Sequence, residues 1–209
     1  MNNELIINEF DKLFPDPKCE LNYTKDYELL LSVMLSAQTT DKSVNNVTDK
    51  LYKEYNTLEK LSTLNEKDIS EYIKRIGFFR TKSNHFYKIV EEIKKIGYVP
   101  NDRNYLESLP GVGRKTASVV LGILFDEPSF AVDTHVYRVS KRLKITKEKD
   151  NLLVTEKKLK KYFPIDKWNR VNTQMVLFGR YYCTSRKPQC DTCFYKNLCD
   201  YTNKKISNK

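Results

Sequence analysis

Residues 109–117, Leu-Pro-Gly-Val-Gly-Arg-Lys-Thr-Ala, place two glycines within three residues, directly before an apolar run. Gly111 and Gly113 allow a tight backbone turn, because glycine adopts positive φ without steric strain. Upstream, residues 102–109 fit a short helix capped by Asp102, and Pro110 fixes φ at the corner. The stretch therefore predicts a helix, a tight hairpin and a second helix.

The start of that second helix is a predicted anion site. Backbone N–H groups at a helix N-terminus carry partial positive charge and bind phosphate. Arg114 and Lys115 add two cationic side chains in the same turn, so the ligand that we expect is a phosphodiester backbone. The alternative is an ordinary helical corner in which Lys115 is a solvated surface lysine.

The charge balance also favours a polyanionic partner. The 209 residues include 37 Lys and Arg against 27 Asp and Glu, which gives a net charge of +10. General solubility is the alternative explanation of this charge. We expect no signal peptide or membrane anchor, since Glu4 and Glu9 interrupt the first ten residues and the longest apolar run is too short to span a bilayer. We therefore expect a cytoplasmic, nucleoid-associated monomer.

Apolar residues recur at helical spacing along most of the chain. Residues 2–14 give the first such segment, Thr40 or Asp41 caps a helix that follows a polar turn, and 152–163 and 166–179 are further examples. No segment has the alternating pattern of a half-buried strand. The predicted fold class is all-α, with only the tail 203–209 expected to be disordered.

Two adjacent phenylalanines lie between the helical segments 65–76 and 81–96. Gly77 is a plausible C-cap of the first segment. Phe78 and Phe79 cannot both be buried on one helical face, because adjacent residues point in different directions. Either one of them projects from a loop, or both pack into the junction.

Four cysteines lie close together near the C-terminal end, with the spacing Cys183-x6-Cys190-x2-Cys193-x5-Cys199. Disulfides are rare inside cells, so a metal is the default interpretation. Structural zinc sites usually combine two C-x2-C knuckles, whereas this loop has one. The spacing favours an iron–sulfur cluster, which takes four cysteine thiolates, over zinc. Such a cluster can serve as a structural staple without a redox role.

Four motifs together resemble the endonuclease III family of helix-hairpin-helix DNA glycosylases. They are the hairpin 109–117, Val-Asp-Thr-His-Val-Tyr-Arg-Val at 132–139, Leu-Ser-Ala-Gln-Thr-Thr-Asp at 35–41, and the cysteine loop. The resemblance implies two all-α domains that flank a DNA-binding cleft, a helical barrel over 19–130 and a 4Fe-4S cluster domain over 1–18 plus 131–209. The cluster ligands would be Cys183, Cys190, Cys193 and Cys199.

The resemblance also implies a chemistry, namely a bifunctional DNA glycosylase and AP lyase of base excision repair. Lys115 would be the nucleophile that attacks the sugar and forms a Schiff base, helped by the helix N-terminus and Arg114, which disfavour the ammonium form. Asp133 would stabilise positive charge on the sugar, as in glycoside hydrolysis, and could also cap its helix. The partner would be double-stranded DNA with a damaged pyrimidine of the thymine glycol type.

A glycosylase must extrude its target base from the duplex. The resemblance assigns the filling of the gap to Gln38 and to the loop at Phe78, where the family more often carries an aliphatic residue. The expected DNA-binding residues are Gln38, Phe78, Gly111, Gly113, Arg114, Thr116, His135, Arg138 and Arg142.

Other functions stay open at this point. One is a related glycosylase for mispaired thymine or pyrimidine dimers, and another is a DNA-binding protein without catalysis. A third is an electron-transfer protein, which would not need the hairpin. Adenine glycosylases with this fold typically lack a lysine at the position of Lys115 and carry an extra C-terminal domain, so the sequence favours the bifunctional enzyme.

Overall fold

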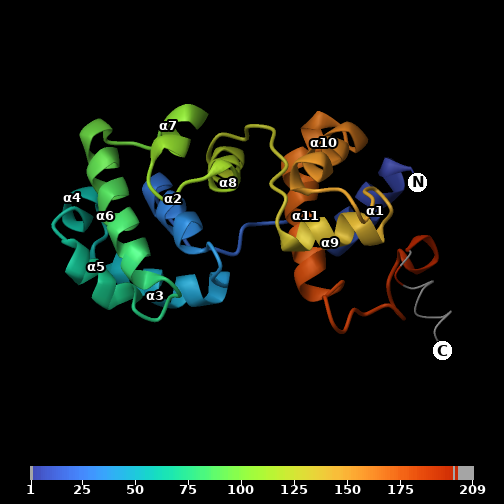
Figure 1. The fold of residues 1–209 in the computed structure, drawn as a ribbon, viewed down its shortest axis with the longest axis horizontal. Helices are drawn as coiled ribbons and strands as arrows, with labels where there is room; N and C mark the ends of the chain where they lie inside the picture. Colours follow the sequence, from blue (N-terminus) through green and yellow to red (C-terminus); the bar gives the residue numbers. More distant parts are fainter. Residues whose placement is uncertain (1, 200, 202–209) are drawn as a thin grey trace. The chain divides into compact units, whose positions relative to one another are not determined.

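The computed structural model describes residues 2–199 and 201, and the tail 203–209 lies outside these residues. The described part of the chain is helical and contains no strand, which confirms the all-α prediction. The chain divides into two compact units (Figure 1). Unit 1 combines Met1–Cys19 with Glu127–Lys209, and unit 2 is the continuous segment Glu20–Asp126. No helix among the described residues is both long and apolar enough to cross a membrane.

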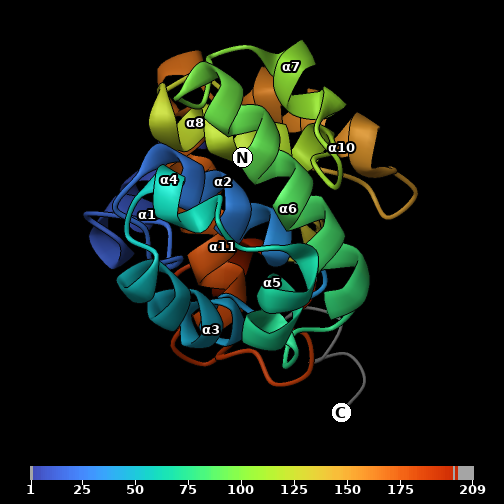
Figure 2. The same ribbon diagram turned by 90° about the vertical axis from the view of Figure 1, so that its left-hand side faces the viewer.

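Unit 2 is built around α2, whose residues are buried on all sides. A helix that is apolar all round belongs in the centre of a domain, and α2 packs against α3, α6 and α8, while α5 packs along α6 (Figure 2). The helices of unit 2 are α2 (Asp26–Leu35), α3 (Asp41–Glu54), α4 (Leu58–Leu61), α5 (Glu66–Ile73), α6 (Phe79–Ile96), α7 (Arg103–Ser108) and α8 (Arg114–Leu124).

Unit 1 joins segments from opposite ends of the sequence. Phe10 of the first helix packs edge-on against Phe178 and Tyr195, at centroid distances of 5.5 and 5.4 Å. The Tyr195 hydroxyl donates to the Ile6 carbonyl at 3.0 Å. The elements of unit 1 are α1 (Asn3–Leu13), α9 (Thr134–Arg142), α10 (Leu152–Tyr162), α11 (Trp168–Tyr181) and the 3-10 turns η1 (Ile165–Lys167) and η2 (Lys196–Leu198).

Side-chain caps fix several helix starts where the sequence predicts them. Asp102 accepts hydrogen bonds from the amides of Asn104 and Tyr105, and Thr40, rather than Asp41, caps α3. The predicted helix 166–179 begins only at Trp168, because the η1 turn precedes it. These caps give the helices defined starting points next to the predicted site residues.

The junction between α5 and α6 differs from the prediction. The expectation that Gly77 ends a helix reaching Ile76 is wrong, because α5 ends at Ile73 with Lys74 as its C-cap. The left-handed residue is Phe78 instead, which has φ 59° and precedes α6 directly. Phe78 is 67% exposed, while Phe79 is half-buried, so one phenylalanine does project from the loop.

Candidate active site and cysteine loop

The glycine hairpin between α7 and α8 forms as the sequence predicts. Gly111 has φ 77°, in the left-handed region, and the Val112 amide donates to the Leu109 carbonyl at 3.1 Å across the turn. Gly113 is the N-cap of α8 and has extended backbone angles. A glycine N-cap has no side chain that could accept from the first turn, so the amides of Lys115 and Thr116 can face an external anion.

His85 on α6 explains why the hairpin requires glycine at its tip. A Cβ atom at Gly111 would lie 2.5 Å from His85 Nδ1 and 3.1 Å from its Cγ. Two constraints therefore require glycine at position 111, namely its positive φ and the histidine ring packed against it. Sequence reasoning missed His85, since nothing local to that residue indicates a contact with the hairpin.

Lys115 lies in the first turn of α8, and its side chain is exposed. It belongs to unit 2, whereas Asp133 belongs to unit 1. The amine is thus accessible from solvent at the positive end of a helix that is eleven residues long. This position suits a nucleophile that must reach a substrate atom.

Asp133 is half-buried and caps α9. Its Oδ1 accepts from the Val136 amide at 2.8 Å, which is the N-cap geometry. The bond uses one carboxylate oxygen at the positive end of the helix, where a negative charge is stabilised. The capping role is therefore observed, and it leaves Oδ2 outside that bond.

The basic side chain of Arg138 on α9 binds backbone carbonyls of its own unit. Arg138 Nε donates to the Cys183 carbonyl at 3.0 Å, and its Nη2 donates to the Gly179 carbonyl at 2.7 Å. The same Nη2 lies 3.2 Å from His135 Nδ1. Burial lowers the pKa of Arg138, and the neighbouring Arg142 acts in the same direction. These contacts hold α9 against α11, and whether Arg138 and His135 also contact DNA stays a prediction.

Arg142 donates hydrogen bonds to the first residues of the cysteine loop. Its Nη1 donates to the Thr184 carbonyl at 2.8 Å and to the Cys183 sulfur at 3.2 Å, and its Nη2 donates to the Ser185 carbonyl at 3.2 Å. The guanidinium carbon also lies 3.9 Å from the centre of the Tyr201 ring. Much of the hydrogen-bonding capacity of this side chain is used inside the unit, and its contact with DNA likewise stays a prediction.

All four cysteines of the C-terminal loop line one cavity, together with Arg142, Phe178 and Tyr182. Burial raises the pKa of the Cys183 and Cys193 thiols, and the other cysteines raise the pKa of Cys193 further. The four cysteines thus lie around one cavity, and four cysteine thiolates are the ligand set that an iron–sulfur cluster takes.

Within the residues that the structure describes, no three His, Cys, Asp or Glu side chains are arranged to hold a single metal ion. A 4Fe-4S cluster binds one thiolate at each of its irons, so its ligands stand further apart than those of one zinc ion. The iron–sulfur cluster therefore stays a prediction from the spacing of the cysteines.

Gln38 and Phe78, the two residues expected to enter the duplex, share an unusual backbone conformation. Gln38 has φ 56° and Phe78 has φ 59°, and both side chains are exposed. A non-glycine residue with positive φ is uncommon and often marks a functional site. Both residues belong to unit 2 and lie in loops next to α2 and α6.

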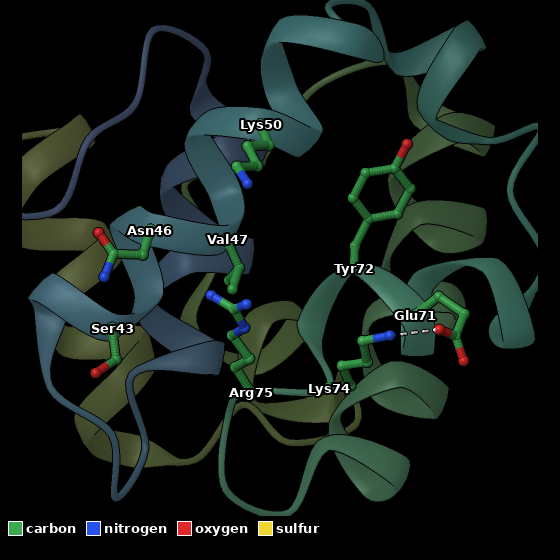
Figure 3. Close-up of a pocket in the computed structure, with 8 residues that line it drawn as sticks. All are labelled: Ser43, Asn46, Val47, Lys50, Glu71, Tyr72, Lys74 and Arg75. Atoms are coloured by element: carbon green, nitrogen blue, oxygen red, sulfur yellow. Dashed lines mark hydrogen bonds and ion pairs between the residues drawn. The ribbon is translucent and has the colours of Figure 1, made fainter.

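A further cavity of about 380 Å³ lies between α3 and α5 in unit 2 (Figure 3). Lys74 forms an ion pair there with Glu71 at 3.0 Å, and the Tyr72 hydroxyl donates to Glu54. None of the predicted site residues lines this cavity, so it is separate from the predicted chemistry. Its lining consists of Ser43, Asn46, Val47, Lys50, Glu71, Tyr72, Lys74 and Arg75.

Comparison with known proteins gives close matches over nearly the whole chain. Residues 31–164 match the HhH-GPD superfamily base excision DNA repair protein family. Endonuclease III of Rickettsia felis is 44% identical over 207 residues, which cover 98% of this chain and 96% of the relative. Endonuclease III of Escherichia coli strain K12 is 43% identical over 192 residues, covering 91% of this chain and 90% of the relative.

A solved structure has the same fold. It is a trapped covalent intermediate of endonuclease III with DNA, at 40% sequence identity and a TM-score of 0.90, and the match covers 99% of this chain and all of the other. The hairpin, the helix-capping Asp133 and the cysteine loop thus occur together in a chain that matches these proteins over nearly its whole length. The chain belongs to the endonuclease III family within the HhH-GPD superfamily of base excision DNA repair proteins.

Proposed function

We propose that this enzyme removes oxidised pyrimidines of the thymine glycol type from duplex DNA and cleaves the strand 3′ to the resulting abasic site. The observation that carries the proposal is the exposed Lys115 in the first turn of α8, directly after the glycine hairpin. Membership of the family makes the chain a base excision DNA glycosylase with AP lyase activity. The substrate and the residue roles are the proposed part.

Lys115 acts as the nucleophile in this proposal. Its neutral amine attacks C1′ of the damaged nucleotide, the bond from C1′ to the base nitrogen breaks, and the base leaves with a proton. The sugar ring opens to an imine between the amine and C1′. Loss of a proton from C2′ then breaks the C3′–O bond and releases the 3′ phosphate. A covalent intermediate with DNA has been trapped for the related endonuclease III, which supports this route.

Asp133 stabilises the positive charge that develops on the sugar as the base departs. Its carboxylate accepts a hydrogen bond from the Val136 amide at 2.8 Å and lies at the positive end of α9. A fixed negative charge next to an oxocarbenium-like centre lowers the barrier without reorganisation. The N-cap geometry thus prepares the aspartate for its catalytic role.

Base extrusion precedes this chemistry and costs a few kcal/mol, less for a damaged base that stacks poorly. Gln38 and Phe78 fill the space that the base leaves. Phe78 is aromatic, so it would stack on the bases that flank the gap.

Phosphate contacts offset the cost of extrusion and make binding depend on salt. We assign them to the amides around Gly111 and Gly113 and to Arg114 and Thr116, and on unit 1 to His135. Arg138 and Arg142 also belong to the proposed phosphate contacts, but only through N–H groups that do not already bind carbonyls of unit 1. We assign the enzyme to the cytoplasm, with the nucleoid, because the substrate in this proposal is chromosomal DNA.

The four cysteines would hold a 4Fe-4S cluster. When bound, such a cluster supplies iron–thiolate bonds that staple a loop with few apolar residues. Arg142 orients the first ligand, Cys183, through its sulfur and through the backbone that follows. Absorption spectra together with iron and zinc analysis of the purified protein test this assignment, because a zinc site is colourless.

Borohydride trapping tests the proposed reaction. Wild type, Lys115→Gln and the surface control Lys94→Gln are each incubated with a duplex that carries one thymine glycol, and with a duplex that carries a plain abasic site. We expect a covalent adduct on both duplexes with wild type and with Lys94→Gln, and none with Lys115→Gln. An adduct on the abasic duplex alone would overturn the substrate assignment, and an adduct with Lys115→Gln would overturn the nucleophile.

A further inference from the structure

Lys82, on the first half of α6, has a buried side chain, although lysine is among the residues least often buried. The residue is 6% exposed. Its Nζ donates to the Leu35 carbonyl at 2.9 Å, to the Ala37 carbonyl at 2.8 Å and to Thr39 Oγ1 at 2.8 Å. Three acceptors match the three N–H groups of an ammonium, so the amine is fully hydrogen-bonded by neutral oxygens.

All three acceptors belong to the end of α2 and the turn that carries Gln38. Leu35 is the last residue of α2, and carbonyls at a helix C-terminus lack intrahelical donors and attract a cation. The turn closes through the Thr39 amide, which donates to the Ser36 carbonyl at 3.0 Å. Lys82 therefore donates hydrogen bonds to the residues on both sides of Gln38, which has φ 56°.

The backbone of Lys82 contacts the second loop. Its amide donates to the Phe78 carbonyl at 3.0 Å and so forms the first turn of α6. Phe78 has φ 59° and no side chain caps this helix. One residue thus joins the Gln38 turn through its side chain and the Phe78 loop through its main chain.

This arrangement costs free energy that a simpler one would avoid. Burial lowers the pKa of Lys82, because a charge is stabilised less in the interior than in water. Left-handed conformations at Gln38 and Phe78 add strain, which persists only where the surroundings enforce it. An apolar residue at position 82 would remove the first cost. It would also remove the Lys82 donor from the Leu35 carbonyl and leave the Ala37 carbonyl with only the Thr39 hydroxyl, at 3.5 Å.

We propose that Lys82 is a positioning residue, which holds Gln38 and Phe78 at a fixed spacing so that both side chains enter the duplex together as the damaged base leaves it. This inference rests on the proposed function, in which these two residues fill the gap. Preorganised side chains lower the barrier to base extrusion because they need no ordering at that moment. The sequence separation between Lys82 and Leu35 is 47 residues, so the spacing depends on the folded unit.

The test compares a substrate that requires extrusion with one that does not. Single-turnover excision of thymine glycol is measured on a fully paired duplex, and on the same duplex with the lesion inside a bubble of unpaired bases, where little unstacking is needed. For Lys82→Met we expect excision from the duplex to fall about tenfold, a factor equivalent to one lost hydrogen bond, and excision from the bubble to change less than about twofold. Lys88→Met, which removes the same charge from an exposed position of α6, should leave both rates unchanged.

A double-mutant cycle shows whether Lys82 acts through the Gln38 turn. Gln38→Ala should slow excision from the duplex by itself, and adding Lys82→Met should slow it little further. Within the described part of the chain, the Lys82 side chain binds only the end of α2 and the Gln38 turn, and the main-chain hydrogen bond to Phe78 is kept in Lys82→Met. Thr39→Val removes one acceptor of the lysine and keeps the residue shape, so it should give a smaller loss of the same kind. Thermal unfolding of each variant sets an assay temperature at which all of them are folded.

Equal slowing of Lys82→Met on duplex and bubble would overturn the inference, since that is the signature of a general effect on the fold. Independent, multiplying effects of Gln38→Ala and Lys82→Met would overturn it as well. Failure of the proposed function gives a different result. Wild type would then excise thymine glycol from neither substrate and form no borohydride adduct, and the inference would fall with it.

Discussion

Nη1 of Arg142 lies 3.2 Å from the sulfur of Cys183, and Asp133 caps the other end of the same helix. Helix α9 therefore carries the proposed catalytic carboxylate at its N-terminus and a hydrogen bond to a proposed cluster ligand in its last turn. Both ends of the helix are fixed by side chains rather than by backbone alone. A change at either end should thus have a defined and separable effect.

Arg142→Met should loosen the cysteine loop. The substitution removes hydrogen bonds to the Cys183 sulfur and to the carbonyls of Thr184 and Ser185, which should lower stability by roughly 2–3 kcal/mol. Iron and sulfide content per chain and the thermal midpoint are the measurements. Lys157→Met, at an exposed position of α10, is the charge-matched control, and an unchanged iron content in Arg142→Met would contradict the expectation.

Gly111→Ala should distort the hairpin, because Cβ would meet His85 Nδ1 at 2.5 Å and the residue has φ 77°. We expect a loss of about 1–3 kcal/mol in unfolding free energy and weaker binding to undamaged duplex DNA. Gly113→Ala is the matched structural control. That residue has extended backbone angles and no neighbour within 4 Å of an added Cβ, so its thermal midpoint should stay close to that of wild type.

Substitutions at Asp133 can separate capping from catalysis. Asparagine caps helices about as well as aspartate, so Asp133→Asn should keep the stability of wild type while excision falls steeply, because the negative charge is gone. Asp133→Ala should lose the same activity and, in addition, about 1 kcal/mol of stability. Thermal unfolding and single-turnover excision of both variants give the comparison, and an active Asp133→Asn would show that the charge is not needed.

Asp150 makes stability depend on pH at the acidic end. Hydrogen bonds from Lys158 Nζ at 2.6 Å and from the Lys147 amide at 2.7 Å hold the pKa of Asp150 below its ordinary value of 3.8. A lowered carboxyl pKa stabilises the native state above the ordinary value, and that contribution is lost as pH falls through the native pKa. The thermal midpoint of Asp150→Asn should therefore lie furthest below that of wild type at neutral pH, and the gap should close below about pH 4. A gap of constant size would contradict the ionic origin of the effect.

Local features of the sequence were sufficient to predict much of the fold. Caps such as Thr40, Asp102 and Asp133 act within three residues of their own position, so the sequence around each of them contains the whole interaction. The same holds for the hairpin, where glycine and proline constrain the backbone directly. The short helix α4 went unpredicted, because its four residues give too little periodicity to recognise.

Residues whose partners are distant in sequence could not be assigned. Lys82 lies on an amphipathic helix, where a lysine is expected on the surface, and its acceptors are 43 to 47 residues away. Arg138 and Arg142 form a basic helix face, which predicts contact with DNA, yet the carbonyls that they bind lie 41 to 45 residues further along the chain. Charge and periodicity in the sequence do not distinguish a cationic side chain that binds DNA phosphate from one that binds a backbone carbonyl of its own domain.

Unit 1 combines the first residues of the chain with the last ones, and this affects the order in which it can fold during synthesis. Phe10 packs against Phe178 and Tyr195, and the Ile6 carbonyl accepts from a residue 189 positions later. Because ribosomes add about 5–20 residues per second, the apolar face of α1 is synthesised roughly ten seconds or more before its partners. Unit 2, a continuous segment, can complete its core in that interval. The apolar residues of segment 3–13 therefore wait for their native contacts until the last helices are synthesised.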